Sequence, residues 1–207
     1  MPRRWKEALI CPLHKKGDTT NSENYRGIAI MDTIYNIMAI SIKNRLKEII
    51  EPKLGQYQCG FRKNRSVMDQ IFVLKQIIDN TIDQNMILHM LFIDYKQAYD
   101  RIIREYIYEA MDELKIKGKL IRLVRMTLTD TTYKVKMSGH LSESFCVDKG
   151  LSQGDPLSTT LFNIVMDKII EESSIASKGT IYSQKTQVLA YADDIVIVTR
   201  TREHLVN

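Results

Sequence analysis

The sequence has few of the residues from which disulfide-rich folds and zinc sites are built. Three of its 207 residues are cysteines and four are histidines. Cys11, Cys59 and Cys146 lie far apart and form no C-x-x-C pair, and the histidines are scattered, which argues against a disulfide framework or a zinc site. We therefore expect three reduced thiols in an intracellular protein, either nuclear or cytoplasmic.

Long apolar runs, internal repeats and low-complexity segments are also missing. No stretch approaches the roughly 18 consecutive apolar residues of a membrane span. The N-terminal segment Met1–Lys6 lacks the apolar core of a signal peptide. We therefore expect neither a membrane-spanning segment nor a signal peptide. Hydrophobic residues make up 44% of the chain and charged residues 27%, which is ordinary for one globular core that can divide into two lobes.

The charge of the chain has a small basic excess. Its 30 lysines and arginines against 25 aspartates and glutamates give a net charge of +5, and the isoelectric point is about 9.0. This balance favours a polyanionic partner only weakly, because many basic proteins bind no nucleic acid.

Periodicity and turn residues predict a chain of mixed helices and strands. Apolar spacing predicts a helix that Asp32 caps and Pro52 ends, and Ser66 with Asp69 resembles a capping box that opens another. Gly118 is expected to be the C-cap between two helices. Interleaved helices with two hairpins favour an α+β fold over a parallel doubly wound sheet. Strands are expected at 8–13, 87–93, 132–137, 144–147, 186–191 and 195–199, and helices at about 34–49, 67–78, 104–117, 119–129 and 157–172.

Acidic residues stand at the ends of two apolar runs. Asp94 follows the near-continuous apolar run Ile87–Ile93, which suits a strand covered on both faces. Asp193 and Asp194 fall at the tip of the second hairpin. Three carboxylates at adjacent strand ends can hold two Mg²⁺ ions. Because strand neighbours point to opposite faces, we expect Asp193 to be the direct ligand and Asp194 a partial or outer one. Alternatively, Asp193 and Asp194 serve only to form the hairpin turn, because aspartate tolerates the left-handed backbone conformation that such turns need.

Several segments, in a fixed order, resemble the motifs of reverse transcriptases. They run from about residue 8 to about residue 200, and some are typical of the non-LTR (LINE-like) retrotransposon branch. The matches are Phe92–Asp100 to motif A, Gly150–Ser158 to motif B, Ala190–Asp194 to motif C, and Asn24–Ile28, Gln58 with Gly60–Arg62, and Leu161–Asn163 to segments of the non-LTR branch.

The resemblance implies a palm-type polymerase fold with a mostly antiparallel sheet and helical fingers. It implies a single reverse transcriptase domain with a fingers subdomain at 1–85 and a C-terminally truncated palm subdomain at 86–207, the thumb being absent. The implied enzyme is an RNA-directed DNA polymerase that works by two-metal nucleotidyl transfer with Mg²⁺, or Mn²⁺ in its place. Its implied partners are an RNA template, a DNA primer and deoxynucleoside triphosphates, with no membrane. The chain would be a fragment of a longer polyprotein and is not expected to polymerise alone.

The resemblance also implies a role for individual residues. Tyr99 lies five residues after Asp94, where the family has an aromatic that packs under the incoming sugar and clashes with a 2′-OH. Lys15 and Arg26 would bind the triphosphate of the incoming nucleotide, with Lys16 as an alternative to Lys15. Arginine suits a triphosphate because its planar guanidinium donates two parallel hydrogen bonds. The implied sets are Asp94, Asp193 and Asp194 for catalysis and metal; Lys15, Arg26, Tyr99, Gln153 and Gly154 for the nucleotide; and Arg62, Lys63 and Arg65 for the template.

Two other functions are left open by the sequence. A palm-type RNA-dependent RNA polymerase shares the aspartate geometry, but Tyr99, and Ala192 where such enzymes usually carry glycine, argue against it. A non-catalytic nucleic-acid-binding remnant would keep the acids without using them. Its binding would be steeply salt-dependent and insensitive to Asp94→Asn.

Overall fold

The chain divides into two compact units, each built from two separate stretches of sequence. The computed structural model describes residues 1–173 and 188–202. Among these residues, no helix combines the length and the apolar character that crossing a membrane requires. The first unit consists of Met1–Ile50 and Tyr99–Phe162, and the second of Glu51–Ala98 and the described residues from Asn163 onward.

The predicted boundary between fingers and palm, near residue 85, does not coincide with the limits of either compact unit. The two units are regions of the chain that pack on themselves, whereas fingers and palm are distinguished by their roles in polymerisation. The division into 1–85 and 86–207 therefore stays a prediction.

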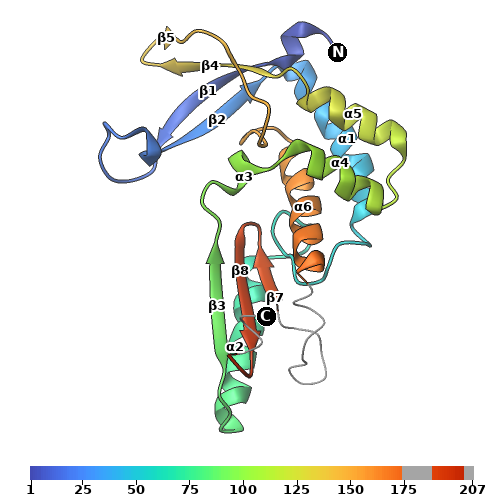
Figure 1. The fold of residues 1–207 in the computed structure, drawn as a ribbon. Helices are drawn as coiled ribbons and strands as arrows, with labels where there is room; N and C mark the ends of the chain where they lie inside the picture. The colour runs from blue at the N-terminus through green and yellow to red at the C-terminus, as the bar shows by residue number, and fades with distance from the viewer. Residues whose placement is uncertain (174–187, 203–207) are drawn as a thin grey trace. The chain divides into compact units, whose positions relative to one another are not determined.

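The first unit contains a mostly antiparallel sheet of five strands (Figure 1). β1 (Glu7–His14) pairs antiparallel with β2 (Tyr25–Met31) and parallel with β4 (Thr132–Met137). The short strands β5 (His140–Leu141) and β6 (Phe145–Cys146) both pair with β4. The predicted hairpin in this region is confirmed, whereas β2 is a strand that the sequence analysis does not predict.

The predicted helices of the first unit are present, and the short helix α3 (Ala98–Arg101) is one that the sequence analysis does not predict. α1 (Thr33–Ile50) begins after Asp32, whose Oδ1 accepts a hydrogen bond from the N–H of Ile34 at 2.9 Å. One face of α1 is buried, and each large apolar side chain on it contributes about 1.5–3 kcal/mol. The buried residues of α1 are Tyr35, Ala39, Ile42, Leu46 and Ile50. The other helices are α3, α4 (Arg104–Glu113), α5 (Gly118–Leu128) and α6 (Ser158–Glu172). The last of these continues into the second unit.

The predicted C-cap at Gly118 is wrong. α4 already ends at Glu113, and the left-handed residue that follows it is Lys115, with φ of 54°. Gly118 is instead the first residue of α5. The N–H groups of Lys115 and Ile116 donate to the carbonyl oxygens of Asp112 and Met111, so Lys115 takes the left-handed position of a Schellman closure that glycine more often fills.

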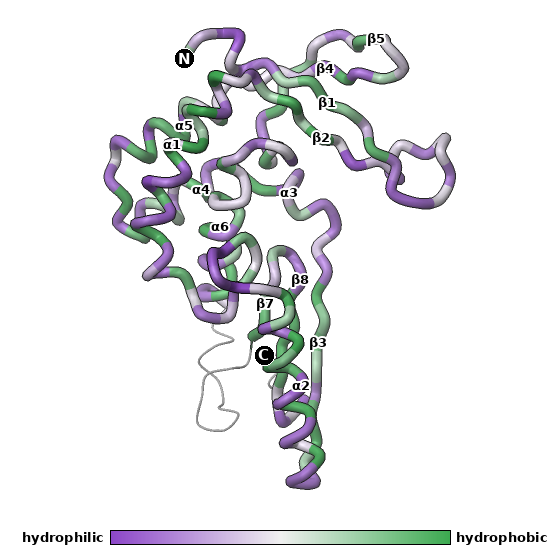
Figure 2. The backbone as a smooth tube through the Cα atoms, turned by 180° about the vertical axis from the view of Figure 1, so that it is seen from behind, coloured by the Kyte–Doolittle hydropathy of each residue, from purple (hydrophilic) through white to green (hydrophobic). Residues whose placement is uncertain are grey.

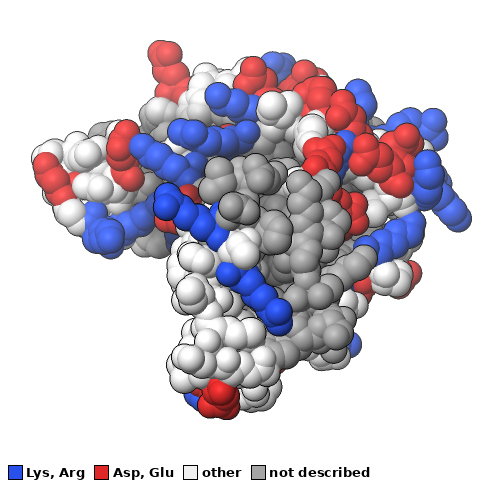
Figure 3. Space-filling model, turned by 60° about the horizontal axis from the view of Figure 1, so that its bottom comes forward, with Lys and Arg blue, Asp and Glu red and all other residues white. Residues whose placement is uncertain are grey.

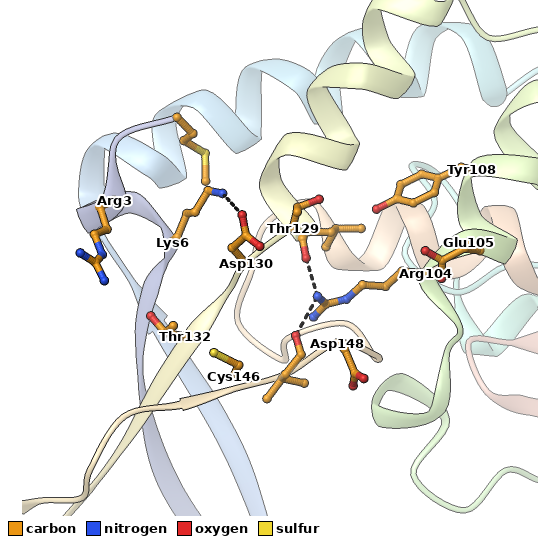
Figure 4. Close-up of a pocket in the computed structure, with 13 residues that line it drawn as sticks. Arg3, Lys6, Arg104, Glu105, Tyr108, Thr129, Asp130, Thr132, Cys146 and Asp148 are labelled. Atoms are coloured by element: carbon orange, nitrogen blue, oxygen red, sulfur yellow. Dashed lines mark hydrogen bonds and ion pairs between the residues drawn. The ribbon is translucent and has the colours of Figure 1, made fainter.

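A buried arginine ties several loops of the first unit together. Arg104 is 6% exposed. Its Nε donates to the carbonyl oxygen of Gly150 at 3.1 Å, and its Nη1 donates to those of Val147, at 2.9 Å, and Leu128. Figure 4 shows this guanidinium beside a cavity of about 880 Å³ whose lining carries charges of both signs. Backbone oxygens thus stabilise a buried charge.

The second unit is a three-stranded antiparallel sheet that packs against one long helix. The strand order is β3 (His89–Asp94), β8 (Asp194–Thr199), β7 (Val188–Tyr191). α2 (Val67–Asp83) contacts the sheet, with Ile77 and Val198 in the core between them. The predicted capping box is confirmed, because the Ser66 and Asp69 side chains and backbone amides bond reciprocally. Residues 186 and 187 of the predicted hairpin lie outside the described part of the chain.

The strand β3 is more exposed than the sequence predicts. It is an edge strand, and Met90, Leu91 and Phe92 are 40%, 39% and 66% exposed. Figure 2 colours much of β3 as hydrophobic. Among the residues that the structure describes, the prediction of a strand covered on both faces is therefore wrong. An apolar run indicates a strand but does not reveal which of its faces are covered.

A buried phenol–carboxylate pair joins α1 to the segment that opens α6. The Tyr35 hydroxyl, in a fully buried side chain, donates to Oδ2 of Asp155 at 2.5 Å. The other carboxylate oxygen accepts the N–H of Leu157 at 2.8 Å. Burial raises the pKa of Asp155, and this effect outweighs the hydrogen bonds from Tyr35 and Leu157, which lower it.

We predict that Asp155→Asn gains stability relative to the parent chain as the pH rises. The pKa of Asp155 is higher in the folded than in the unfolded chain, where it is about 3.9. Its stabilising contribution is therefore present below about pH 4 and is lost as the pH rises through the folded pKa. Urea denaturation between about pH 4 and pH 8 measures the difference in unfolding free energy. Asp112→Asn, which removes an exposed charge from α4, is the control; a difference that is constant with pH would contradict the prediction.

Candidate active site

Two of the three candidate catalytic acids lie opposite each other on paired strands. Asp94 ends β3, Asp194 begins β8, and the two are partners in the antiparallel register. Side chains directly opposite each other point to the same face, with Cβ atoms about 4.5–5.5 Å apart. Asp193 precedes Asp194 in the two-residue turn after β7. All three acids belong to the second unit.

The carboxylates form an electrostatically unfavourable group. Partial burial, followed by the negative charges of Asp193 and Asp94, raises the pKa of Asp194. A divalent cation relieves such repulsion, and carboxylate oxygens are the ligands that Mg²⁺ prefers. Within residues 1–173 and 188–202, no three His, Cys, Asp or Glu side chains converge closely enough to hold a metal ion. The metal roles of Asp94, Asp193 and Asp194 therefore stay predictions, and what the structure adds is the pairing of Asp94 with Asp194.

A buried glutamine that the sequence analysis did not assign to the site contacts the acidic turn. The Gln58 side chain is bonded to both the N–H and the carbonyl oxygen of Ala192, the residue before Asp193. The only sequence signal for it is its place in a segment that resembles a fingers motif. Nothing in that resemblance indicates that its side chain reaches the hairpin.

Two of the candidate triphosphate ligands share one face of the β1–β2 hairpin. Arg26 pairs with Leu13 in the register, and the N–H of Lys15 donates to the carbonyl oxygen of Asn24 at 2.8 Å, which continues the pairing. Alternate residues of a strand point to the same side, so Lys15 and Arg26 are diagonal neighbours on one face. Both are exposed. Lys16 follows on in the turn, which favours Lys15 as the partner of Arg26.

The candidate sugar-contacting aromatic is held by a stacked ring. The ring of Tyr99 stacks on that of Phe162, with centroids 4.4 Å apart and an interplanar angle of 2°. The carbonyl oxygen of Tyr99 accepts a hydrogen bond from the N–H of Leu151 at 2.8 Å. The backbone of motif A is thus bonded directly to the loop of motif B within the first unit.

The motif B loop is anchored on the strand that carries Arg26. The carbonyl oxygen of Gln153 accepts the N–H of Ala29, in β2, at 2.7 Å. Gly154 has φ of 116°, and a Cβ there would collide with the carbonyl oxygen of Ala29, so this position requires glycine. A cavity of about 270 Å³ beside the loop is lined in part by Gln153 and Asp100. The five nucleotide candidates all belong to the first unit.

The three basic residues assigned to the template differ in exposure. Arg62 is 7% exposed, with its guanidinium bonded to the carboxylate of Glu51 at 2.9 Å and to the carbonyl oxygen of Gly55 at 2.6 Å. Lys63 is exposed, and Arg65 is half-buried and bonded to Gln56. In Figure 3, basic and acidic side chains are intermixed over the upper part of the view, whereas the described surface in the lower part is mostly uncharged. The template roles stay predictions, and in this structure the Arg62 side chain holds its own loop.

Comparison with curated proteins identifies relatives among retrotransposable elements. The retrovirus-related Pol polyprotein of a type-1 retrotransposable element R2 from Popillia japonica is 27% identical over 201 residues, which cover 96% of this chain and 28% of the relative. The RNA-directed DNA polymerase from mobile element jockey of Drosophila melanogaster is 24% identical, with 99% and 22% covered. The chain thus spans about a quarter of the length of these relatives. They confirm the predicted resemblance to the non-LTR branch.

Comparison with solved structures confirms the α+β, palm-type polymerase fold. An apo telomerase from Candida tropicalis superimposes with a TM-score of 0.70 at 15% identity, covering 97% of this chain and 45% of the telomerase. The RNA-dependent RNA polymerase of bacteriophage phi12 gives a TM-score of 0.50 at 10% identity, with 87% and 29% covered. At such low identities these likenesses show the fold alone. The family profile described as "Reverse transcriptase (RNA-dependent DNA polymerase)" matches residues 13–207, and the chain therefore belongs to the reverse transcriptase family.

Proposed function

We propose that the chain supplies the fingers and palm of an enzyme that copies an RNA template into DNA. In this reaction the 3′-OH of a DNA primer attacks the α-phosphorus of a deoxynucleoside triphosphate, and pyrophosphate leaves. The observation that carries the proposal is the pairing of Asp94 with Asp194 at the strand ends of a chain that belongs to the reverse transcriptase family. A palm-type fold supports it.

The acids of the second unit would hold the metal. Asp94, Asp193 and Asp194 would hold two Mg²⁺ ions, whose charge would favour ionisation of the primer hydroxyl and stabilise the leaving pyrophosphate. The chain itself contributes fixed charge in a fixed place, because Asp94 and Asp194 stand on hydrogen-bonded strands rather than on a free loop. Catalysis of this kind consists mainly of positioning and electrostatic stabilisation.

The candidates of the first unit would bind the nucleotide. Lys15 and Arg26, on one face of the hairpin, suit the triphosphate charges. The Tyr99 ring would lie under the sugar, with its plane fixed by the stack on Phe162. Gln153 and Gly154 would contact the nucleotide from a loop whose backbone is anchored on β2.

The basic loop before α2 would contact the template without reading its sequence. Lys63 is exposed and can reach a phosphate, and Arg65 can do so by exchanging its bond to Gln56. Arg62 would support the loop from inside and can reach a phosphate only by giving up its present bonds.

We predict that Asp94→Asn lowers Mg²⁺-dependent deoxynucleotide incorporation by at least about 10²-fold, because a neutral amide removes charge from the metal-binding face. The assay is primer extension on an RNA template. It uses the 207-residue chain and the same chain extended by the segment that follows motif C in a curated relative. Asp83→Asn, an exposed aspartate at the end of α2, is the matched control.

Incorporation by either form of the parent chain, retained in Asp83→Asn and lost in Asp94→Asn, supports the proposal. If neither form extends a primer with Mg²⁺ or Mn²⁺, or if Asp94→Asn is as active as the control, the proposal is wrong.

We further predict that Tyr99→Val relaxes sugar selection. Removing the ring opens space for a 2′-OH, so the preference for deoxynucleotides over ribonucleotides should fall by about tenfold or more. Tyr99→Phe keeps the ring and the stack and should keep the preference. The measurement is the ratio of kcat/KM for the two substrates. Equal use of both by the parent chain would favour an RNA-dependent RNA polymerase instead.

A further inference from the structure

The turn that joins β7 to β8 contains a residue in an unfavourable backbone conformation. Ala192 has φ of 59°, a left-handed value at which the Cβ of an L-residue crowds the following carbonyl oxygen. Glycine adopts this value freely, whereas alanine needs other contacts to hold it there. Asp193 follows directly, so whatever fixes Ala192 also fixes the start of the acidic pair.

One buried amide side chain makes the contacts that hold Ala192. Gln58 is 1% exposed. Its Oε1 accepts the N–H of Ala192 at 2.9 Å and the N–H of Gly60 at 2.8 Å, and its Nε2 donates to the carbonyl oxygen of Ala192 at 3.1 Å. An apolar side chain of the same size would fill the space but leave these three backbone groups without their partner.

The segment around Gln58 is itself fixed within the second unit. The N–H of Cys59 donates to the carbonyl oxygen of Ala190 at 2.9 Å, and the N–H of Ala190 donates to that of Tyr57 at 2.9 Å. The segment therefore pairs with β7 through one parallel bridge, between Gln58 and Ala190, and Figure 1 shows the connection before α2 passing this hairpin. Arg62 donates to the carbonyl oxygen of Gln58 at 3.1 Å. The amide thus acts from a rigid support.

The backbone of Gly60 lies directly against the turn. A Cβ at this position would collide with the backbone nitrogen of Ala192. The side chain of Asn163 donates to the carbonyl oxygen of Gly60 at 2.8 Å, which holds it in place. The loop before α2 therefore contacts Ala192 through a side chain and through a backbone that has no room for a Cβ.

We propose that Gln58 is a positioning residue for the acidic pair. Its amide holds Ala192 in the conformation from which the chain passes through Asp193 into Asp194, and it thereby places the Asp94–Asp194 pair that a divalent cation would bind. This inference rests on the proposed function and adds a residue to it. Gln58 bonds to the backbone of the turn and not to the carboxylates, so its effect on the cation passes through the turn.

Binding of Mn²⁺ tests this role without requiring turnover. The 207-residue chain is titrated with Mn²⁺, and the free ion is followed by electron paramagnetic resonance at a temperature below the melting transition of every variant. Gln58→Met should bind Mn²⁺ about tenfold or more weakly than Gln76→Met, the same substitution at an exposed position of α2. Exchange of the Ala192 amide hydrogen, measured by nuclear magnetic resonance, should become faster in Gln58→Met but not in Gln76→Met.

A double variant separates the conformation of the turn from general packing. Because glycine adopts a positive φ without penalty, Gln58→Met with Ala192→Gly should regain at least about half of the lost affinity on a logarithmic scale. The proposal is overturned if Gln58→Met binds Mn²⁺ as tightly as Gln76→Met. It is also overturned if the double variant binds no better than Gln58→Met, because the amide would then act through packing alone.

Asp94→Asn distinguishes a failure of this inference from a failure of the proposed function. One outcome is that the parent chain binds Mn²⁺, that Asp94→Asn does not, and that Gln58→Met binds it as the parent does. In that case only the role of Gln58 is wrong. If the parent chain binds no Mn²⁺, or Asp94→Asn binds it equally well, the assignment of the metal site is wrong and the role of Gln58 is rejected with it.

Discussion

The arrangement of the acidic residues depends on the contact between a buried amide and a two-residue turn. A turn this short leaves Ala192 in a left-handed conformation, and the groups that hold it come from a loop more than 130 residues earlier in the chain. The paired strands fix where Asp94 and Asp194 stand, and Gln58 fixes how the chain passes between β7 and β8. Local strand geometry and one long-range contact together define this end of the sheet.

Much of the local structure could be predicted from the sequence, because its signals are local. The cap at Asp32, the capping box at Ser66 and the helix after Pro156 all form as expected. The strand β2 was missed because Gly27 and Ala29 are poor strand formers, and its pairing with β1 supplies what its own residues do not. The exposure of β3 could not be predicted either, since an apolar run does not show what covers it.

For the candidate site, the sequence could predict residue types and their order but not which side chains are buried. The three acids are candidates because motif spacing marks them. Arg62 lies in a segment whose basic composition suggests a solvated loop, but its side chain is buried and hydrogen-bonded within its unit. Gln58 is likewise a polar residue that the fold buries. Which partner a buried polar group finds is a tertiary property, and neither periodicity nor charge reveals it.

The edge position of β3 has a consequence for handling the protein. Among the described residues, no further strand pairs with its outer side, and the side chains along it are largely apolar and exposed. An uncovered edge of this kind readily adds a strand from another molecule. We therefore expect the isolated chain to self-associate through this edge at high concentration, and a charged residue or a proline on the outer side of β3 to reduce that association.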